Sequence, residues 1–198
     1  MVKNIAKIMM GLLMLAVVFI GYIPQPKYLI ELTCVSNTLG GLLLLIDGIW
    51  GITKRKTCPN SFYLNITVSL LVVYLVCIGS LTGAYKFNFS GAFFFMHVIN
   101  PIAFLIYYTL FVNEHDQKIK FVLTAPTMTM MYLLFDYTQY KFTGEFVYGF
   151  IKPEELTLDG AIIAAIVIYA LLYLFGLFLF FLNRLVHKRD EKSKIEEL

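Results

Sequence analysis

Long apolar stretches, separated by short polar breaks, constrain this chain more than any other feature. A helix needs about 20 apolar residues to cross the hydrocarbon core of a bilayer, and a chain of 198 residues has room for six such helices and little else. Pro, Gly and charged residues end the apolar stretches, which cover residues 8–23, 29–52, 62–83, 92–113, 121–139 and 160–183. The sequence therefore predicts an all-α polytopic membrane protein, with a bundle of six transmembrane helices over 1–185 and a charged cytoplasmic tail over 186–198.

The composition excludes most soluble functions. Hydrophobic residues make up 59% of the chain and charged residues 15%, and the mean hydropathy is +0.76, which is too apolar for a soluble globular domain. The sequence has no Gly-rich phosphate loop and no Cys/His pattern at zinc spacing. We therefore expect the membrane as a partner, no nucleic-acid partner, and no metal or other cofactor.

Basic residues predict the orientation of the bundle. The termini and the loops that alternate with them carry 12 Lys and Arg residues, whereas the opposite loops carry only Lys27, Lys86, Lys141 and Lys152. Positively charged loops stay in the cytoplasm. Both termini are accordingly predicted to be cytoplasmic, and the same alternation supports an even number of spans.

Three polar residues from different predicted helices fall at one depth. Thr33 lies about five residues inside the second helix, or ~7 Å from its outer end, and His97 lies about six residues inside the fourth, or ~9 Å. Asp136 lies near the outer end of the fifth helix. Polar groups inside a bilayer are costly and often functional. This layer in the outer half of the membrane is therefore the candidate site.

The polar pattern continues inward from Thr33 and His97. Asn37 is one turn below Thr33, and Asn100 is about one turn below His97, so each pair shares a helix face. Two such stripes indicate either a cavity or a hydrogen-bonded seam. The structural alternatives are that Thr33 bonds its own backbone, that Asp136 reaches water, and that His97 finds a partner only to satisfy its imidazole.

Three segments together resemble a known family. These are Glu31-Leu-Thr-Cys-Val-Ser-Asn37, His97-Val-Ile-Asn-Pro101 and Thr143-Gly-Glu-Phe-Val-Tyr-Gly-Phe150, each near an apolar stretch. In this order they resemble the androgen-dependent TFPI-regulating protein family and its bacterial six-helix relatives, over roughly residues 29–183. The animal members are described as intramembrane threonine hydrolases that cleave fatty acid esters of hydroxy fatty acids. The resemblance implies Thr33 and His97 as the catalytic pair and a bacterial cell membrane as the location.

The leading hypothesis from these observations is an intramembrane lipid ester hydrolase that takes a fatty acyl ester from the outer leaflet. Thr33 would attack the ester and His97 would act as its base. Asp136 or Asn100 would orient the imidazole, and Asn37 is the best placed side chain to stabilise the oxyanion. Phe93, Phe94 and Phe95 are expected to form an apolar trough for the acyl chain.

Two other classes of function stay open at this stage. One is a small-molecule transporter or ligand-binding membrane protein whose polar seam lines a passage, and the other is a structural or partner-binding membrane subunit. A passage requires polar groups from one face of the membrane to the other, whereas a hydrolase requires them only around the scissile bond. The cytoplasmic halves of the third, fifth and sixth predicted helices are almost entirely apolar, which favours a one-sided pocket. The substrate's chain length and the oligomeric state are left open.

Overall fold

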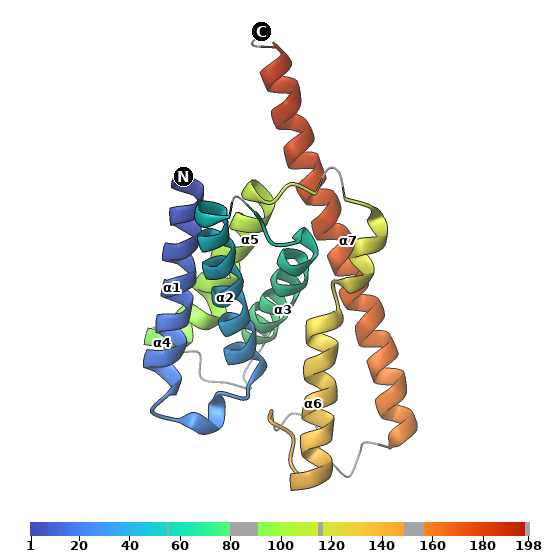
Figure 1. Cartoon of the computed structure of the whole chain (residues 1–198). Helices are drawn as coiled ribbons and strands as arrows, with labels where there is room; N and C mark the ends of the chain where they lie inside the picture. Colours follow the sequence, from blue (N-terminus) through green and yellow to red (C-terminus); the bar gives the residue numbers. More distant parts are fainter. Residues whose placement is uncertain (55, 80–90, 115–116, 149–156, 197–198) are drawn as a thin grey trace.

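The described part of the chain is a bundle of helices without a β-strand (Figure 1). The computed structural model describes residues 1–54, 56–79, 91–114, 117–148 and 157–196. In chain order the elements are α1 (Val2–Tyr22), η1 (Pro26–Tyr28), α2 (Leu32–Thr53), α3 (Asn60–Gly79), α4 (Gly91–Phe94), η3 (Phe95–Ile99), α5 (Asn100–Phe111), η4 (Ile119–Thr124), α6 (Thr127–Thr143) and α7 (Leu158–Glu196).

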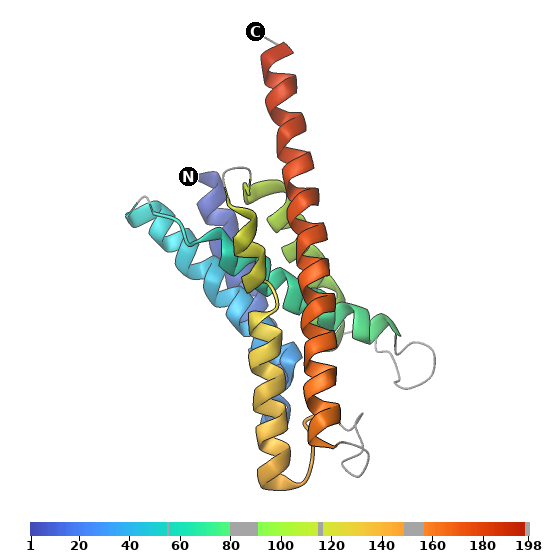
Figure 2. The same cartoon turned by 90° about the vertical axis from the view of Figure 1, so that its right-hand side faces the viewer.

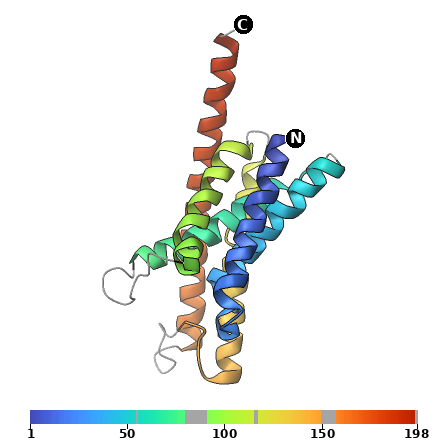
Figure 3. The same cartoon turned by 90° about the vertical axis from the view of Figure 1, so that its left-hand side faces the viewer.

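These elements make six passes through the bundle and confirm the predicted fold class. Five helices are long and apolar enough to span a membrane, with α4, η3 and α5 forming one of them from Gly91 to Phe111. The sixth pass is made by η4 and α6 together. Both ends of the chain lie towards the same end of the bundle (Figures 1 and 3). The protein is therefore an integral membrane protein of six helical passes.

One predicted helix requires correction, and the predicted tail has a structure that the sequence did not indicate. The predicted helix at 121–139 is divided, because Pro126 has no amide proton to give to the carbonyl of Val122, four residues earlier. That carbonyl accepts the amide of Ala125 at 2.9 Å instead. The chain forms η4 before Pro126, α6 starts after it, and the first-turn amide of Met128 bonds Asn65 Oδ1 of α3 at 3.0 Å. In addition, α7 continues unbroken past residue 186, so the predicted tail begins as a helical extension of the last span (Figure 2).

Glycines allow α1 and α2 to pack at very short range. A Cβ atom on Gly11 would lie 2.6 Å from the carbonyl oxygen of Gly41, and one on Gly41 would lie 2.9 Å from the side chain of Leu15. Helices in lipid associate through small residues of this kind, since their surfaces gain little from the hydrophobic effect. This interface holds α2, which carries Thr33 and Asn37, against α1.

A buried ion pair joins α1, α2 and α3 at the end of the bundle that carries the N-terminus. Lys7 Nζ donates to Asp47 Oδ2 at 2.6 Å, and the Tyr63 hydroxyl donates to the same oxygen at 2.5 Å. The backbone amide of Cys58 donates to Asp47 Oδ1 at 2.5 Å. Both carboxylate oxygens are thus satisfied, as a charge buried in a membrane protein requires.

This ion pair predicts a non-additive pattern of stability. Lys7→Met should lower the free energy of unfolding by about 3 kcal/mol, because it leaves the buried Asp47 carboxylate without a counter-charge. Adding Asp47→Asn to that variant should recover a large part of the loss, and Lys3→Met, at an exposed neighbour, should have little effect. Denaturation of the purified protein in detergent micelles measures all three. Equal, additive losses for the two substitutions would contradict the pairing.

Candidate active site

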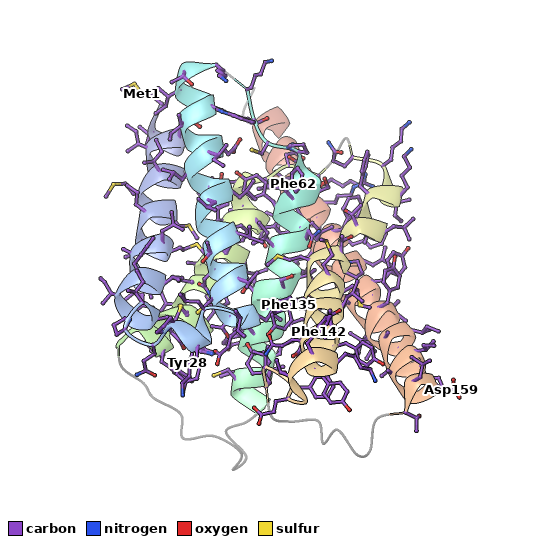
Figure 4. All side chains as sticks on the ribbon, turned by 60° about the horizontal axis from the view of Figure 1, so that its bottom comes forward. Met1, Tyr28, Phe62, Phe135, Phe142 and Asp159 are labelled. Carbon is purple, nitrogen blue, oxygen red and sulfur yellow. The ribbon has the colours of Figure 1, made fainter. Side chains whose placement is uncertain are left out.

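A cavity of about 680 Å³ opens near the end of the bundle where α2 begins and α6 ends. Thr33 of α2, His97 of η3 and Asp136 of α6 all line it, although they come from three distant parts of the chain. Tyr28, which also lines it, lies in Figure 4 towards the same end of the bundle as Phe142 and Asp159. A volume of this size is within the range of small-molecule sites, about 300–1,000 Å³.

Thr33 and His97 are within hydrogen-bond distance. Thr33 Oγ1 lies 3.3 Å from His97 Nε2, and the Thr33 side chain is buried while His97 is half-buried. Both residues were predicted to lie in one layer of the membrane, and the structure places them in contact. A hydroxyl beside an imidazole nitrogen is the basic arrangement of an activated nucleophile.

A π-helical turn gives His97 its position. The amide of Asn100 bonds the carbonyl of Phe95, five residues earlier, instead of the residue four earlier. Pro101 follows directly and has no amide proton to give to the carbonyl of His97, so the regular helical pattern is interrupted here. Such turns widen a helix locally and are frequent at functional sites.

The second ring nitrogen of His97 fixes its tautomer. His97 Nδ1 lies 2.9 Å from the carbonyl oxygen of Phe93, and the two rings stack with centroids 4.0 Å apart. Because a carbonyl oxygen can only accept, this bond places the proton on Nδ1 and leaves Nε2 as an acceptor facing Thr33. The imidazole is therefore oriented by a backbone carbonyl and by ring stacking, in the manner of a base.

The two asparagines have different partners from those predicted. Asn100 Nδ2 donates to Asn37 Oδ1 at 2.8 Å, so Asn100 does not orient the imidazole. Asn37 Nδ2 donates to the carbonyl oxygens of Thr33 at 2.8 Å and Met96 at 3.1 Å. Both amide protons of Asn37 are used in these bonds, and the expectation that it stabilises an oxyanion is therefore abandoned. Asn37 and Asn100 thus form a hydrogen-bonded seam, which was one of the two alternatives that the polar pattern predicted.

Asp136 bonds the backbone of a loop, and not the imidazole of His97 that was predicted as its partner. Its Oδ1 accepts the backbone amide of Val147 at 2.7 Å. The next residue, Tyr148, reaches back to α2, where its hydroxyl lies 3.3 Å from both the backbone nitrogen and Oγ1 of Thr33. Sequence reasoning missed Tyr148 as a site residue. The available signal was its place in the third motif segment, whose last residues, Gly149 and Phe150, lie outside the described residues.

Apolar side chains make up most of the cavity wall, and one of the three predicted phenylalanines is among them. Of Phe93, Phe94 and Phe95, only Phe93 is among the described lining residues, and Phe95 is 36% exposed on the outside of the bundle. The walls come from three other helices: Val72, Val73 and Val76 of α3, Leu133 of α6, and Ile168 and Leu172 of α7. An apolar chamber thus extends from the polar pair into the bundle.

Comparison of the chain with protein-family models, with curated proteins and with solved structures gives no match. In the described ranges, no group of three or more His, Cys, Asp or Glu side chains is close enough to hold a metal ion.

Proposed function

We propose that this protein is an intramembrane lipid ester hydrolase in which Thr33 is the nucleophile and His97 the base. One observation carries the proposal: a buried threonine hydroxyl lies 3.3 Å from a histidine nitrogen whose tautomer leaves it free to accept a proton, at the wall of an apolar cavity. A threonine hydroxyl is a weak nucleophile at neutral pH and needs such a base. The motif resemblance to intramembrane threonine hydrolases points to the same two residues.

The proposed reaction has two halves. In the first, His97 Nε2 takes the proton of the Thr33 hydroxyl as Oγ1 attacks the ester carbonyl, and the alcohol leaves with that proton, giving an acyl-threonine. In the second, His97 removes a proton from water, the resulting hydroxide attacks the acyl carbon, and the proton returns to Thr33 as the fatty acid leaves. The imidazole ends each cycle neutral, which suits a site in a membrane.

The walls of the cavity favour a fatty acyl ester as the substrate. An acyl chain buries apolar surface against the valines of α3 and against Leu133, Ile168 and Leu172, at about 0.8 kcal/mol for each buried methylene. No residue of α7 between Leu158 and Leu171 is buried, and α6 and α7 diverge towards this end of the bundle (Figure 1). This exposed side is a route for a lipid from the surrounding leaflet.

A transporter is the alternative, and the packing below the site argues against it. On the inner side of Thr33 and His97, the Asn37–Asn100 bond closes the seam. Met96, Leu44 and Phe104 are fully buried there and belong to the packed interior. A passage across the membrane would have to break this packing, whereas a one-sided hydrolase pocket does not.

We also propose that the chain belongs to the family that its motifs resemble, that it lies in a bacterial cell membrane and that both termini are cytoplasmic. The resemblance in three motifs supports the first two, and the division of the basic residues supports cytoplasmic termini. With that orientation, the cavity opens towards the outer leaflet.

Substitution of the pair should reveal a single catalytic unit. Thr33→Ala, His97→Ala and the double variant should each lose nearly all hydrolysis of a 4-nitrophenyl ester, by similar and non-additive factors. Thr33→Ser should keep substantial activity because it retains the hydroxyl. Ser36→Ala, which removes a buried hydroxyl one turn away on α2, serves as the matched control and should stay active. Full turnover by a folded Thr33→Ala protein would exclude the threonine as nucleophile.

The orientation can be tested independently of activity. Lys27 and Lys54 are exposed beyond opposite ends of α2, and the three native cysteines are buried. In a background with the native cysteines replaced by Ala, Lys27→Cys should react with an impermeant maleimide on intact cells, and Lys54→Cys only after permeabilisation. The reverse pattern would place the cavity at the cytoplasmic leaflet.

A further inference from the structure

The hydroxyl of Tyr148 contacts both the side chain and the backbone of Thr33. Its oxygen lies 3.3 Å from Thr33 Oγ1 and also 3.3 Å from the backbone nitrogen of Thr33, which donates to it. Thr33 is the second residue of α2, and first-turn amides have no acceptor within their own helix. The Thr33 amide therefore holds the phenol oxygen, and the phenol O–H is a hydrogen-bond donor beside the atom that would attack an ester.

A turn and two side-chain contacts place Tyr148 beside Thr33. α6 ends at Thr143, and the φ of 80° at the capping residue Gly144 is left-handed and lets the chain turn back. The Phe146 ring then stacks on Tyr140 of α6, with centroids 4.5 Å apart. Asp136 accepts the amide of Val147 at 2.7 Å. These contacts anchor the loop along α6, with Tyr148 next in the chain.

Tyr148 is protonated, as a donor must be. Burial raises the pKa of Tyr148 to about 12, so the phenol keeps its proton throughout the neutral range. Asn37, the side chain that the sequence suggested for this task, has both amide protons in other bonds.

We propose that Tyr148 is a catalytic residue that stabilises the oxyanion, and that Asp136 is the positioning residue that holds it there. The inference rests on the hydrolase proposed above. When Oγ1 bonds the carbonyl carbon and its proton passes to His97 Nε2, the carbonyl electron pair moves onto the oxygen. The Tyr148 O–H donates to that oxygen, while the Thr33 N–H keeps donating to the phenol oxygen. These two hydrogen bonds last until the carbonyl re-forms, the alkoxide leaves and the proton passes from His97 to it. Donors aimed at developing charge in this way are often the largest contribution to catalysis.

Single substitutions in the full-length protein test both roles with a 4-nitrophenyl ester as the probe. Tyr148→Phe keeps the ring and should lower kcat about 100-fold or more, the usual loss for one oxyanion donor, with KM little changed. Tyr137→Phe, which removes a hydroxyl from α6 at a residue that does not line the cavity, should leave kcat near wild type. Asp136→Ala should resemble Tyr148→Phe, and Asp136→Asn, which retains an oxygen acceptor for Val147, should restore most of kcat.

The outcomes separate this inference from the proposed function. Wild-type kcat in Tyr148→Phe, with Thr33→Ala inactive, would overturn the role of Tyr148 and leave the hydrolase intact. A rise in KM alone would assign Tyr148 to substrate binding and would equally overturn it. Loss of activity in Asp136→Asn as great as in Asp136→Ala would overturn the positioning role. If Tyr148→Phe does not fold, the comparison of Asp136→Ala with Asp136→Asn tests the role of Tyr148, because both variants leave Tyr148 itself unchanged. An active Thr33→Ala would refute the hydrolase and the oxyanion role together.

Discussion

The hydrogen bond between Asn100 and Asn37 is the contact on which the site depends. Two amide side chains that are almost fully buried in a membrane protein must satisfy each other or pay a large desolvation cost, and here Asn37 also bonds the backbone of Met96, next to His97. This seam sets the register of α2 against η3 and α5. Thr33, one turn above Asn37, then faces His97 as a consequence.

α2 also carries a second buried polar centre, in which a charge is neutralised by an ion pair. At the far end of α2, Asp47 is a charge in a buried position, and Lys7, Tyr63 and the amide of Cys58 satisfy both of its oxygens. The centre around Thr33 adjoins a large cavity that Glu31 and Asp136 also line, whereas the centre around Asp47 is closed by its ion pair. The first arrangement can accept a substrate and exchange protons with it. The second ties three helices together.

The sequence was sufficient to predict the fold class and the common depth of Thr33 and His97, because hydrophobic length and the depth of a residue in a span follow directly from residue spacing. Depth alone does not predict a contact, and the pairing of the two residues came from the motif resemblance. It was insufficient for the partners of Asn37, Asn100 and Asp136. Each of these side chains had several polar groups within the same layer, and the choice depends on how the helices rotate about their axes. Hydropathy does not encode those rotations, nor the order of helices that makes α3, α6 and α7 the cavity walls. Tyr148 was missed for a related reason, since its position depends on the turn at Gly144 and on the anchor at Asp136.

The central claim is that the Thr33 hydroxyl is activated as a nucleophile, and covalent labelling tests it most directly. The purified, folded protein is treated with a fluorophosphonate, which reacts with activated hydroxyl groups, and the adduct is mapped by peptide mass spectrometry. An activated Thr33 should give one adduct, on its own hydroxyl, and this adduct should disappear in His97→Ala because the base is removed. An adduct on another residue, or no adduct on a folded protein that hydrolyses esters, would contradict the activation of Thr33.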